Sequence, residues 1–224
     1  MLKKSCFAPA ALAILLASFG SAEAAIAVYK TQASYLAAIS APGVDTFDDL
    51  NPTGALATPQ TRIAGPYAYT ASAGPERQFF PAGEVRGDVW LSTFRRTDSI
   101  TFSEFSSGVR GVGGFFFKTD ESGLFSSATA RINFSITDAS GTVQDKLDDS
   151  TLMSFLGFVS TGPFISLKLW VADEGFGVDG VWASVNDLTL GAAAVAPPIP
   201  EPETYALMLG GLALLGALTR RNKV

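Results

Sequence analysis

The stretch from Thr129 to Asp138, TARINFSITD, decides the fold of this chain. Its apolar residues Ala130, Ile132, Phe134 and Ile136 alternate with polar residues. In a β-strand successive side chains point to opposite faces, so this period of two predicts a strand with one buried and one solvated face. A strand of this kind belongs in a sheet that covers a core on one side only.

Ile165–Val171 repeats the alternation, and eight further segments have the composition of short strands. Gly-, Ser- and Asp-rich turn signals separate many of them, among them Asp120-Glu121-Ser122-Gly123. No crossover helices are visible, so we expect an all-β fold, an antiparallel β-sandwich or jelly roll of about nine or ten strands. The eight segments are Ala27–Lys30, Val44–Phe47, Tyr67–Ala71, Val89–Phe94, Ile100–Ser103, Val112–Lys118, Leu152–Val159 and Leu188–Leu190.

One short helix is expected near the start of this domain, over Gln32–Ile39. Thr31 is a residue type that caps helix amino termini well. At helical spacing Tyr35, Leu36 and Ile39 share one face, and we expect that face to be buried.

Composition excludes several classes of function. The chain has 224 residues, a formal net charge of −5 and no histidine. An acidic chain is unsuited to nucleic acid, which needs a basic face against phosphates. Without histidine, the Ser-His-Asp triad and the usual zinc sites are ruled out. The 47% hydrophobic content predicts a globular domain instead of a disordered chain.

The amino end has the pattern of a secretory signal peptide. Lys3-Lys4 precede an apolar run from Phe7 to Phe19, and Ala22 and Ala24 give the small-x-small pattern of a signal peptidase site. We therefore expect residues 1–24 to be removed on export. Cys6 is the one cysteine in the chain, so the exported part would contain no disulfide.

The carboxyl end has the pattern of a weak membrane anchor. Residues 191–199 (GAAAVAPPI) form an Ala- and Pro-rich linker after the domain expected at 25–190. The apolar run from Tyr205 to Leu218 gives about 21 Å of helix, short of the roughly 30 Å hydrocarbon core. Arg220 and Arg221 follow it and should stay cytoplasmic. We expect a transient transmembrane tail at 200–224, with the domain outside.

Pro200-Glu201-Pro202, the Gly- and Leu-rich apolar helix and Arg220-Arg221 together resemble a PEP-CTERM sorting signal. The resemblance implies that exosortase, a membrane-embedded cysteine peptidase or transpeptidase of Gram-negative bacteria, reads this tail. It also implies export across the inner membrane and delivery to the cell surface or the exopolysaccharide matrix, which makes exopolysaccharide a candidate partner. The residues implied as sorting features of the substrate are Pro200, Glu201, Pro202, Arg220 and Arg221.

The middle of the chain is similar to the β-sandwich domains that often precede this signal. The similarity rests on Asp45-Thr46-Phe47-Asp48-Asp49-Leu50, on Val112-Gly113-Gly114-Phe115-Phe116-Phe117 and on Asn186-Asp187-Leu188-Thr189. It implies the fold and no activity.

Three acidic clusters are candidates for a cation site, because Ca²⁺ takes six to eight oxygen ligands. None has EF-hand spacing, so solvated turns without a cofactor are the favoured interpretation and a structural calcium is the alternative. The third cluster straddles a Gly-rich loop and is the main metal candidate. The clusters are Asp45, Asp48 and Asp49; Asp145, Asp148 and Asp149, expected in a turn; and Asp173, Glu174 and Asp179.

Aromatic residues are the last candidates. Trp170, whose neighbours Leu169 and Val171 should point the other way, is placed to stack on a sugar ring. Trp90 and Trp182, with Tyr67 and Tyr69, are further candidates for an aromatic platform on which sugar rings stack. The alternative, which we favour, is that Trp90, Trp170 and Trp182 pack in the core or cover a sheet edge.

The sequence predicts a non-enzymatic protein of the cell surface or matrix. A carbohydrate-binding module is the second hypothesis and a glycoside-acting enzyme the third. Hydrolysis needs two carboxylates opposed across a concave sheet. The only strand-borne candidates, Glu84 and Glu104, are expected at the surface.

Overall fold

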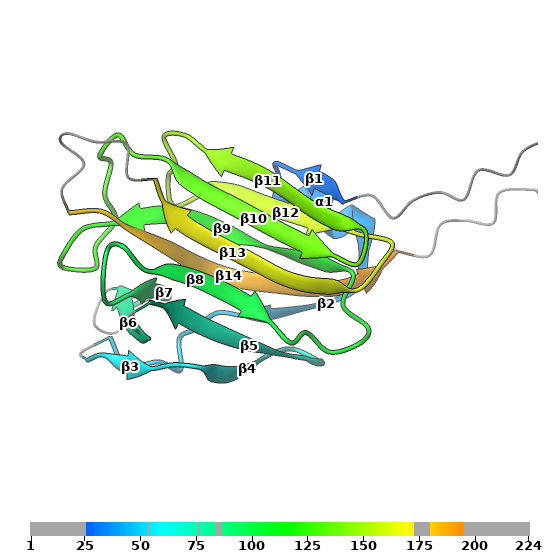
Figure 1. Ribbon diagram of the computed structural model, residues 1–224, viewed down its shortest axis with the longest axis horizontal. Coiled ribbons are helices and arrows are strands. Elements are labelled where there is room, and N and C mark those ends of the chain that lie inside the picture. The colour runs from blue at the N-terminus through cyan, green and yellow to red at the C-terminus, as the bar shows by residue number, and fades with distance from the viewer. Residues whose placement is uncertain (1–25, 53, 76, 84–86, 173–179, 195–224) are drawn as a thin grey trace, which may run out of the picture.

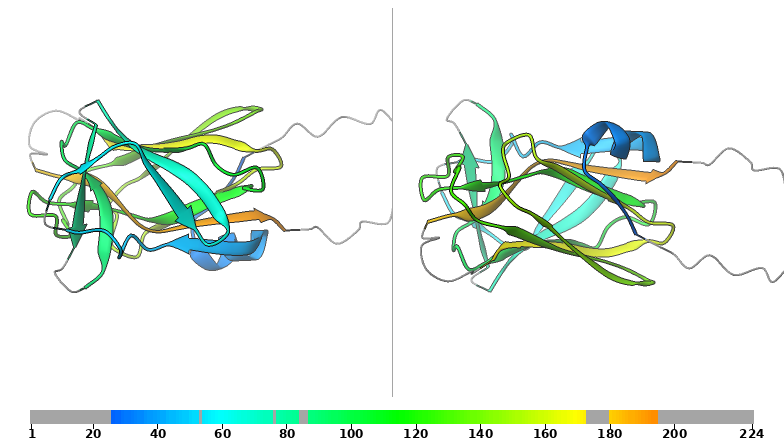
Figure 2. Two further views of the ribbon diagram at one scale, coloured as in Figure 1. Left: turned by 90° about the horizontal axis from the view of Figure 1, so that it is seen from below. Right: turned by 90° about the horizontal axis from the view of Figure 1, so that it is seen from above.

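The computed structural model describes residues 26–52, 54–75, 77–83, 87–172 and 180–194. Within these residues, fourteen strands form two antiparallel sheets, and there is one helix, α1 (Gln32–Ala38). The sheets lie face to face, and α1 lies outside the larger one (Figures 1 and 2). The predicted antiparallel β-sandwich is confirmed.

The larger sheet has eight strands in the order β1-β12-β9-β14-β7-β6-β3, and β2 also pairs with β14. Its strands are β1 (Ala27–Tyr29), β2 (Ile39–Asp45), β3 (Leu56–Ala57), β6 (Gln78–Gly83), β7 (Val89–Thr93), β9 (Gly111–Thr119), β12 (Phe155–Val159) and β14 (Trp182–Ala193).

The smaller sheet has six strands in the order β11-β10-β13-β8-β5-β4. Its strands are β4 (Gln60–Ala64), β5 (Tyr67–Gly74), β8 (Ser99–Ser103), β10 (Ile132–Asp138), β11 (Gly141–Leu147) and β13 (Phe164–Val171).

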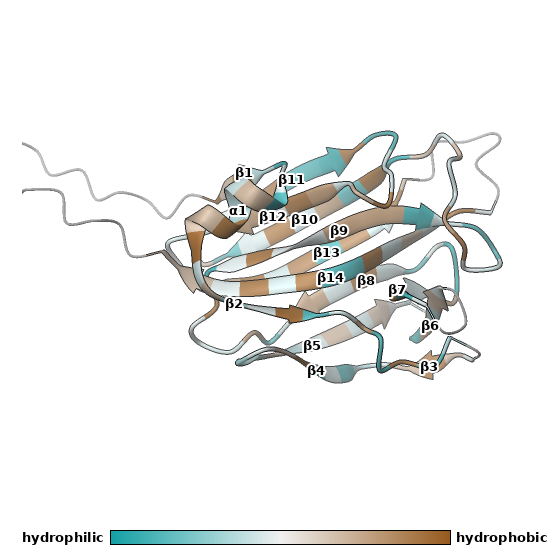
Figure 3. Cartoon of the chain, turned by 180° about the vertical axis from the view of Figure 1, so that it is seen from behind, coloured by the Kyte–Doolittle hydropathy of each residue, from teal (hydrophilic) through white to brown (hydrophobic). Residues whose placement is uncertain are grey.

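The main core lies between the sheets, and β10 shows how the sequence builds it. Ile132, Phe134 and Ile136 are fully buried, as the alternation predicts. Across the core, Phe134 meets Phe116 of β9 edge to face, with ring centroids 4.9 Å apart, a favoured geometry for aromatic pairs. A similar alternation of apolar and polar residues runs along β14 in Figure 3.

Helix α1 covers part of the outer face of the eight-stranded sheet. Thr31 caps it as predicted, its Oγ1 accepting a hydrogen bond from Ser34 N. Tyr35 is fully buried and donates a 2.9 Å hydrogen bond to Thr189 O of β14. The prediction for Leu36 was wrong, since its side chain is 38% exposed. The helix also ends before Ile39, which begins β2.

Several strand boundaries differ from those predicted. Four strands, β3, β4, β6 and β11, were not expected, because their sequences lack a clear apolar period. In β11, an edge strand, one face is polar and exposed and the other holds the half-buried Val143, Asp145 and Leu147. β2 begins at Ile39 and ends at Asp45 instead of spanning Val44–Phe47. β14 runs to Ala193, so the first three residues of the expected 191–199 linker are paired strand.

β14 changes its neighbour along its length. Its first half pairs with β7, with Ser184 opposite Ser92, and its second half pairs with β2, with Leu188 opposite Asp45. Between them lies a β-bulge at which Asp187 takes a φ of +50°. Asp and Asn are among the residues that tolerate this left-handed conformation.

The two ends of the described domain leave it close together. Ala27 of β1 lies opposite Val159, Val159 opposite Gly111, and Gly111 opposite Gly191. The first and last described residues, 26 and 194, therefore lie at the same end of the sandwich (Figure 1). Within the described ranges, no helix has the length and apolar character needed to cross a bilayer.

Candidate functional site

The two outer faces of the sandwich differ in how they are covered. The eight-stranded sheet is covered at one end by α1, through Tyr35 and Phe155, and elsewhere by a cluster around Trp90 and Phe117. On the six-stranded sheet the outward residues alternate with buried ones and are themselves half-buried or exposed. We call this outer surface the polar face.

Hydroxyl and amide side chains in register across the sheet predominate on the polar face, which also carries two lysines, Trp170 and the exposed Ile63. One row contributes a Ser or Thr from each of the six strands, and Thr137 and Thr142 within it are hydrogen-bonded at 2.9 Å. The members of that row are Thr142, Thr137, Ser166, Ser103, Thr70 and Thr61. The next rows hold Gln144, Ser135, Lys168, Thr101 and Ser72, and then Lys146, Asn133 and Trp170.

Trp170 is the large aromatic residue of the polar face. Its neighbours Leu169 and Val171 point into the core, as predicted from the alternation, and Trp170 itself is half-buried on the outside opposite Asn133. Lys168 Nζ lies 5.5 Å from the centre of its ring, within cation–π range. Our favoured interpretation, in which Trp170 packs in the core or covers a sheet edge, was wrong, because Trp170 is half-buried on the outside and β13 lies inside the six-stranded sheet.

A shallow groove of about 330 Å³ lies between β10 and β11, and one of its lining residues, Asn133, is opposite Trp170 of β13. Asn133, Gln144 and Lys146 line it together with Asp145, which forms an ion pair with Lys30 of β1. An aromatic ring with amide and ammonium groups next to it is an arrangement that can hold a sugar ring by its apolar face and its hydroxyl groups.

The other aromatic candidates lie elsewhere. Trp90 is 6% exposed, stacks edge to face on Phe117 and donates a hydrogen bond to Gly123 O, so its packing is structural. Tyr67 and Tyr69 are buried, which rules them out as members of the aromatic platform for which they were candidates. Trp182 is half-buried at the start of β14.

The first acidic cluster is an ion-pair network. Asp45, 5% exposed at the end of β2, accepts hydrogen bonds from Arg62 and Tyr69, and Arg62 also binds Asp49. Burial lowers the pKa of Arg62, but its bonds to the two carboxylates outweigh this and raise it overall. Asp48 accepts a bond from Val89 N. The prediction of a solvated turn was wrong for Asp45.

The second acidic cluster is also satisfied by cations. Asp145 lies in strand β11 instead of the predicted turn and pairs with Lys30. Asp148 pairs with Arg131 and Lys146, and the hydrogen bond from Arg131 lowers its pKa. Asp149 has a φ of +49°. Within the described residues, no three acidic side chains are grouped closely enough to hold a metal ion.

Other predicted residues fall outside the described ones. They are the metal candidates Asp173, Glu174 and Asp179, the carboxylate Glu84, the signal-cleavage residues Ala22 and Ala24, and the sorting residues Pro200, Glu201, Pro202, Arg220 and Arg221. Glu104 is exposed, as expected, and accepts a hydrogen bond from Thr70.

Sequence reasoning did not find a second hollow, on the eight-stranded sheet above the bulge of β14. It has a volume of about 420 Å³ and is lined by Trp90, Phe115, Asp88 and Asp187 among others. Partial burial raises the pKa of Asp187, and repulsion from Asp88 and Asp48 adds to this. The sequence at this position, Asn186-Asp187-Leu188-Thr189, predicts the fold and no binding site.

The described residues thus define a β-sandwich with one polar, aromatic-bearing face. At the end of the chain, residues 198–223 match the PEP-CTERM protein-sorting motif. The chain carries this motif, as the resemblance of its tail predicted, and the motif implies an exported protein that exosortase recognises.

No curated protein matches the chain. Among solved structures, it is similar to CBM51-2 with INT domains of Clostridium perfringens ZmpB in complex with GlcNAc, at 12% identity and a TM-score of 0.35, over 70% of this chain and 32% of that one. The chain thus spans about a third of that structure. It is also similar to CBM51 of Clostridium perfringens GH95 in complex with methyl-galactose, at 16% identity and a TM-score of 0.33, over 66% of this chain and 99% of that one. A third similar structure is TmCBM61 in complex with β-1,4-galactotriose, at 11% identity and a TM-score of 0.31, over 55% of this chain and 88% of that one.

Proposed function

We propose that this exported chain is a non-enzymatic protein of the cell surface or exopolysaccharide matrix of a Gram-negative bacterium, and that it binds polysaccharide on the polar face. The observation that carries the proposal is the position of Trp170, a half-exposed ring at one end of a sheet surface made of hydroxyl and amide groups. The sorting motif supports the location, because it implies an exported protein.

The flat ring of Trp170 suits the apolar face of a pyranose. Asn133, opposite Trp170, and Gln144 in the adjoining groove supply donors and acceptors for sugar hydroxyls. Rows of Ser and Thr continue across the whole sheet, so an extended chain of sugars would find similar partners along its length.

Charge favours an acidic polysaccharide. The chain carries a net charge of −5, yet Lys168 contacts the ring of Trp170 and Lys146 lies in the same row of the polar face, beyond Asn133. An ammonium group attracts a carboxylate by about 1 kcal/mol at 4 Å even in bulk water. Carboxylate-bearing sugars therefore fit this face better than neutral ones.

The positions of the carboxylates support a non-enzymatic role. Glycoside hydrolysis needs an acid and a base or nucleophile on opposite sides of the bond. The acidic residues nearest to Trp170, Asp145 and Asp148, are both engaged in ion pairs with Lys or Arg. They act as partners of cations in this arrangement.

The test compares dextran with carboxymethyl-dextran, which share one backbone. We expect the mature protein to be retarded by carboxymethyl-dextran in affinity electrophoresis, and less so by dextran. Trp170→Ala and Lys168→Gln should each weaken this retardation about tenfold or more. Arg77→Gln removes an exposed cation outside the polar face and should change nothing. Retardation that survives Trp170→Ala would contradict the proposal.

A further inference from the structure

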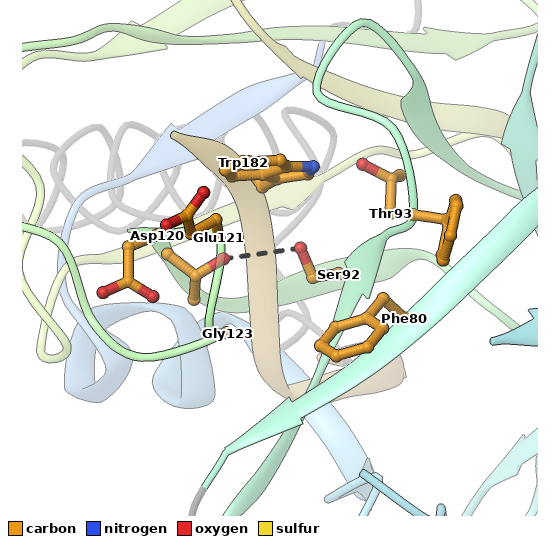
Figure 4. A pocket seen from close by; sticks show the side chains of 9 residues that line it. Phe80, Ser92, Thr93, Asp120, Glu121, Gly123 and Trp182 are labelled. Atoms are coloured by element: carbon orange, nitrogen blue, oxygen red, sulfur yellow. Dashed lines mark hydrogen bonds between the residues drawn. The ribbon is translucent and has the colours of Figure 1, made fainter. Parts of the chain in front are cut away.

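A third hollow lies at the start of β14, away from the polar face (Figure 4). Its volume is about 210 Å³. Strands β6, β7, β9 and β14 and the turn that follows β9 each contribute to its lining. Because drug-sized ligands occupy sites of about 300–1,000 Å³, this hollow has room for a single small ring.

Aromatic rings line the hollow on opposite sides. In Figure 4 the ring of Trp182 is seen edge-on above it and the ring of Phe80 lies below. Phe94, 44% exposed, also contributes to the lining. Both Trp182 and Phe80 are half-buried, so part of each ring remains available to a ligand.

Hydroxyl groups lie between the two rings. Ser92 and Thr119 are within 3.5 Å of each other, and Thr119 is hydrogen-bonded to Ser184 at 2.9 Å. Ser92 also reaches Ala183 O at 3.2 Å. All three hydroxyls lie on buried residues, and neighbouring strands hold them in place. Ser92 and Thr119 line the hollow and give it a polar, pre-organised floor, which the bond between Thr119 and Ser184 holds in place.

The turn after β9 places carboxylates on one side. Asp120 Oδ1 accepts hydrogen bonds from Ser122 N and Leu124 N, which holds the turn closed. Glu121, next in sequence, is exposed and also lines the hollow. Gly123 has a φ of +78°, and a Cβ there would lie 2.8 Å from Ala82 Cβ. The turn is therefore fixed against β6, with its carboxylates beside the aromatic rings.

We propose that this Trp182 hollow binds one neutral pyranose ring, such as the terminal unit of a polysaccharide. The rings of Trp182 and Phe80 contact the apolar face of the sugar, and the hydroxyl floor and the carboxylates bind its hydroxyl groups. Glu121 repels a uronate, so the site discriminates against acidic sugars. This preference is the opposite of that of the polar face, and the site is independent of it.

The test uses saturation-transfer NMR on the mature protein with methyl glucoside, methyl galactoside and N-acetylglucosamine as neutral probes and glucuronate as the acidic one. We expect at least one neutral probe to bind with a dissociation constant in the millimolar range, and glucuronate to bind about tenfold more weakly. Trp182→Ala should abolish binding of the neutral probe. Val44→Ala, which shortens an exposed side chain of β2 away from the hollow, is the control and should leave it unchanged.

Glu121→Gln provides a second test, in which no buried side chain is changed. Because Glu121 is exposed, the variant should fold normally. The ratio of its dissociation constants for glucuronate and for the neutral probe should be smaller than in the parent protein. The proposal would be overturned if the neutral probe still bound to Trp182→Ala, or if none of the neutral probes bound to the parent protein. It would also be overturned if Glu121→Gln kept the same ratio of affinities for the neutral probe and glucuronate. Carboxymethyl-dextran retardation, which depends on Trp170, reports separately on the polar face.

Discussion

Tyr69 Oη lies 2.6 Å from Asp45 Oδ2 and donates a hydrogen bond to it, and this contact joins the two sheets of the sandwich. Asp45 ends β2 of the eight-stranded sheet, whereas Tyr69 and Arg62 belong to the six-stranded one. Burial raises the pKa of Tyr69, so the phenol stays protonated and remains the donor. Arg62 binds both oxygens of Asp45, which completes a largely buried inter-sheet cluster.

The two carboxylates that bind Arg62 should differ sharply in their effect on stability. Asp45→Asn breaks a buried ion pair and should cost about 3–5 kcal/mol. Asp49→Asn removes a partner whose side chain is 70% exposed, and should cost less than about 1 kcal/mol. Urea unfolding of the two variants beside the parent protein measures both values. Equal costs would mean that Asp45 does not join the sheets.

Packing of α1 against the sheet depends on a glycine. A Cβ at Gly157 would lie 2.5 Å from Tyr35 Cδ2, so Gly157→Ala should displace the ring and cost about 1–3 kcal/mol. Tyr35→Phe loses the bond to Thr189 O and should cost a similar amount. Gly54→Ala, at a position with nothing within 4 Å of the new Cβ, is the control. Thermal unfolding should leave the control within experimental error of the parent.

Stability should depend on pH through Asp187. The folded-state pKa of this carboxyl is raised, so the folded state binds its proton more tightly than the unfolded state does. Ionisation of Asp187 therefore lowers the free energy of unfolding as pH rises through the folded-state pKa. Below the unfolded-state pKa this loss of stability is absent. Asp187→Asn, which also tolerates a positive φ, should raise the melting temperature at pH 7 and have little effect near pH 4. A variant that is less stable at pH 7 would contradict this account of the bulge.

Processing should require both ends of the sorting motif. Changing Pro200-Glu201-Pro202 to three alanines, or Arg220 and Arg221 to Glu, should leave export through the amino-terminal signal intact and prevent removal of the tail. The arginines matter because positive residues stay on the cytoplasmic side and fix the tail in the membrane. Intact mass and C-terminal peptide mapping of surface or matrix material give the answer. Mature protein that still contains Met208 would identify a permanent membrane anchor.

Neither reductant nor chelator should affect the mature domain. With Cys6 removed in the signal peptide, the exported chain has no cysteine, so dithiothreitol should leave its melting temperature unchanged. We expect the same of EDTA, because the acidic groups around Arg62 and Arg131 are paired with cationic side chains. A lower melting temperature in EDTA would instead assign a structural calcium, for which Asp173, Glu174 and Asp179 are the candidates.

The sequence predicted the sandwich because strands such as β10 and β13 bury one face and solvate the other, which leaves a period of two. The sequence did not predict β11 and β4, which lie at the edges of the six-stranded sheet. Backbone pairing with a neighbouring strand stabilises them more than burial of side chains does. The outward position of Trp170 followed from the same alternation. The Trp182 hollow could not be found in this way, since it joins residues 80, 92, 121 and 182, whose proximity depends on the order of strands in the sheet.

The two described ends of the domain lie at one end of the sandwich, and β14 leads from that end to the Trp182 hollow. β14 has twelve residues, which span roughly 40 Å, with Trp182 at its first position and Ala193 at its last. Trp182 and Ala193 therefore lie at opposite ends of this strand, and the sorting motif follows Ala193 in the sequence. The length of β14 thus separates the proposed sugar site from the point where the described chain ends, so changes at that end need not disturb the hollow.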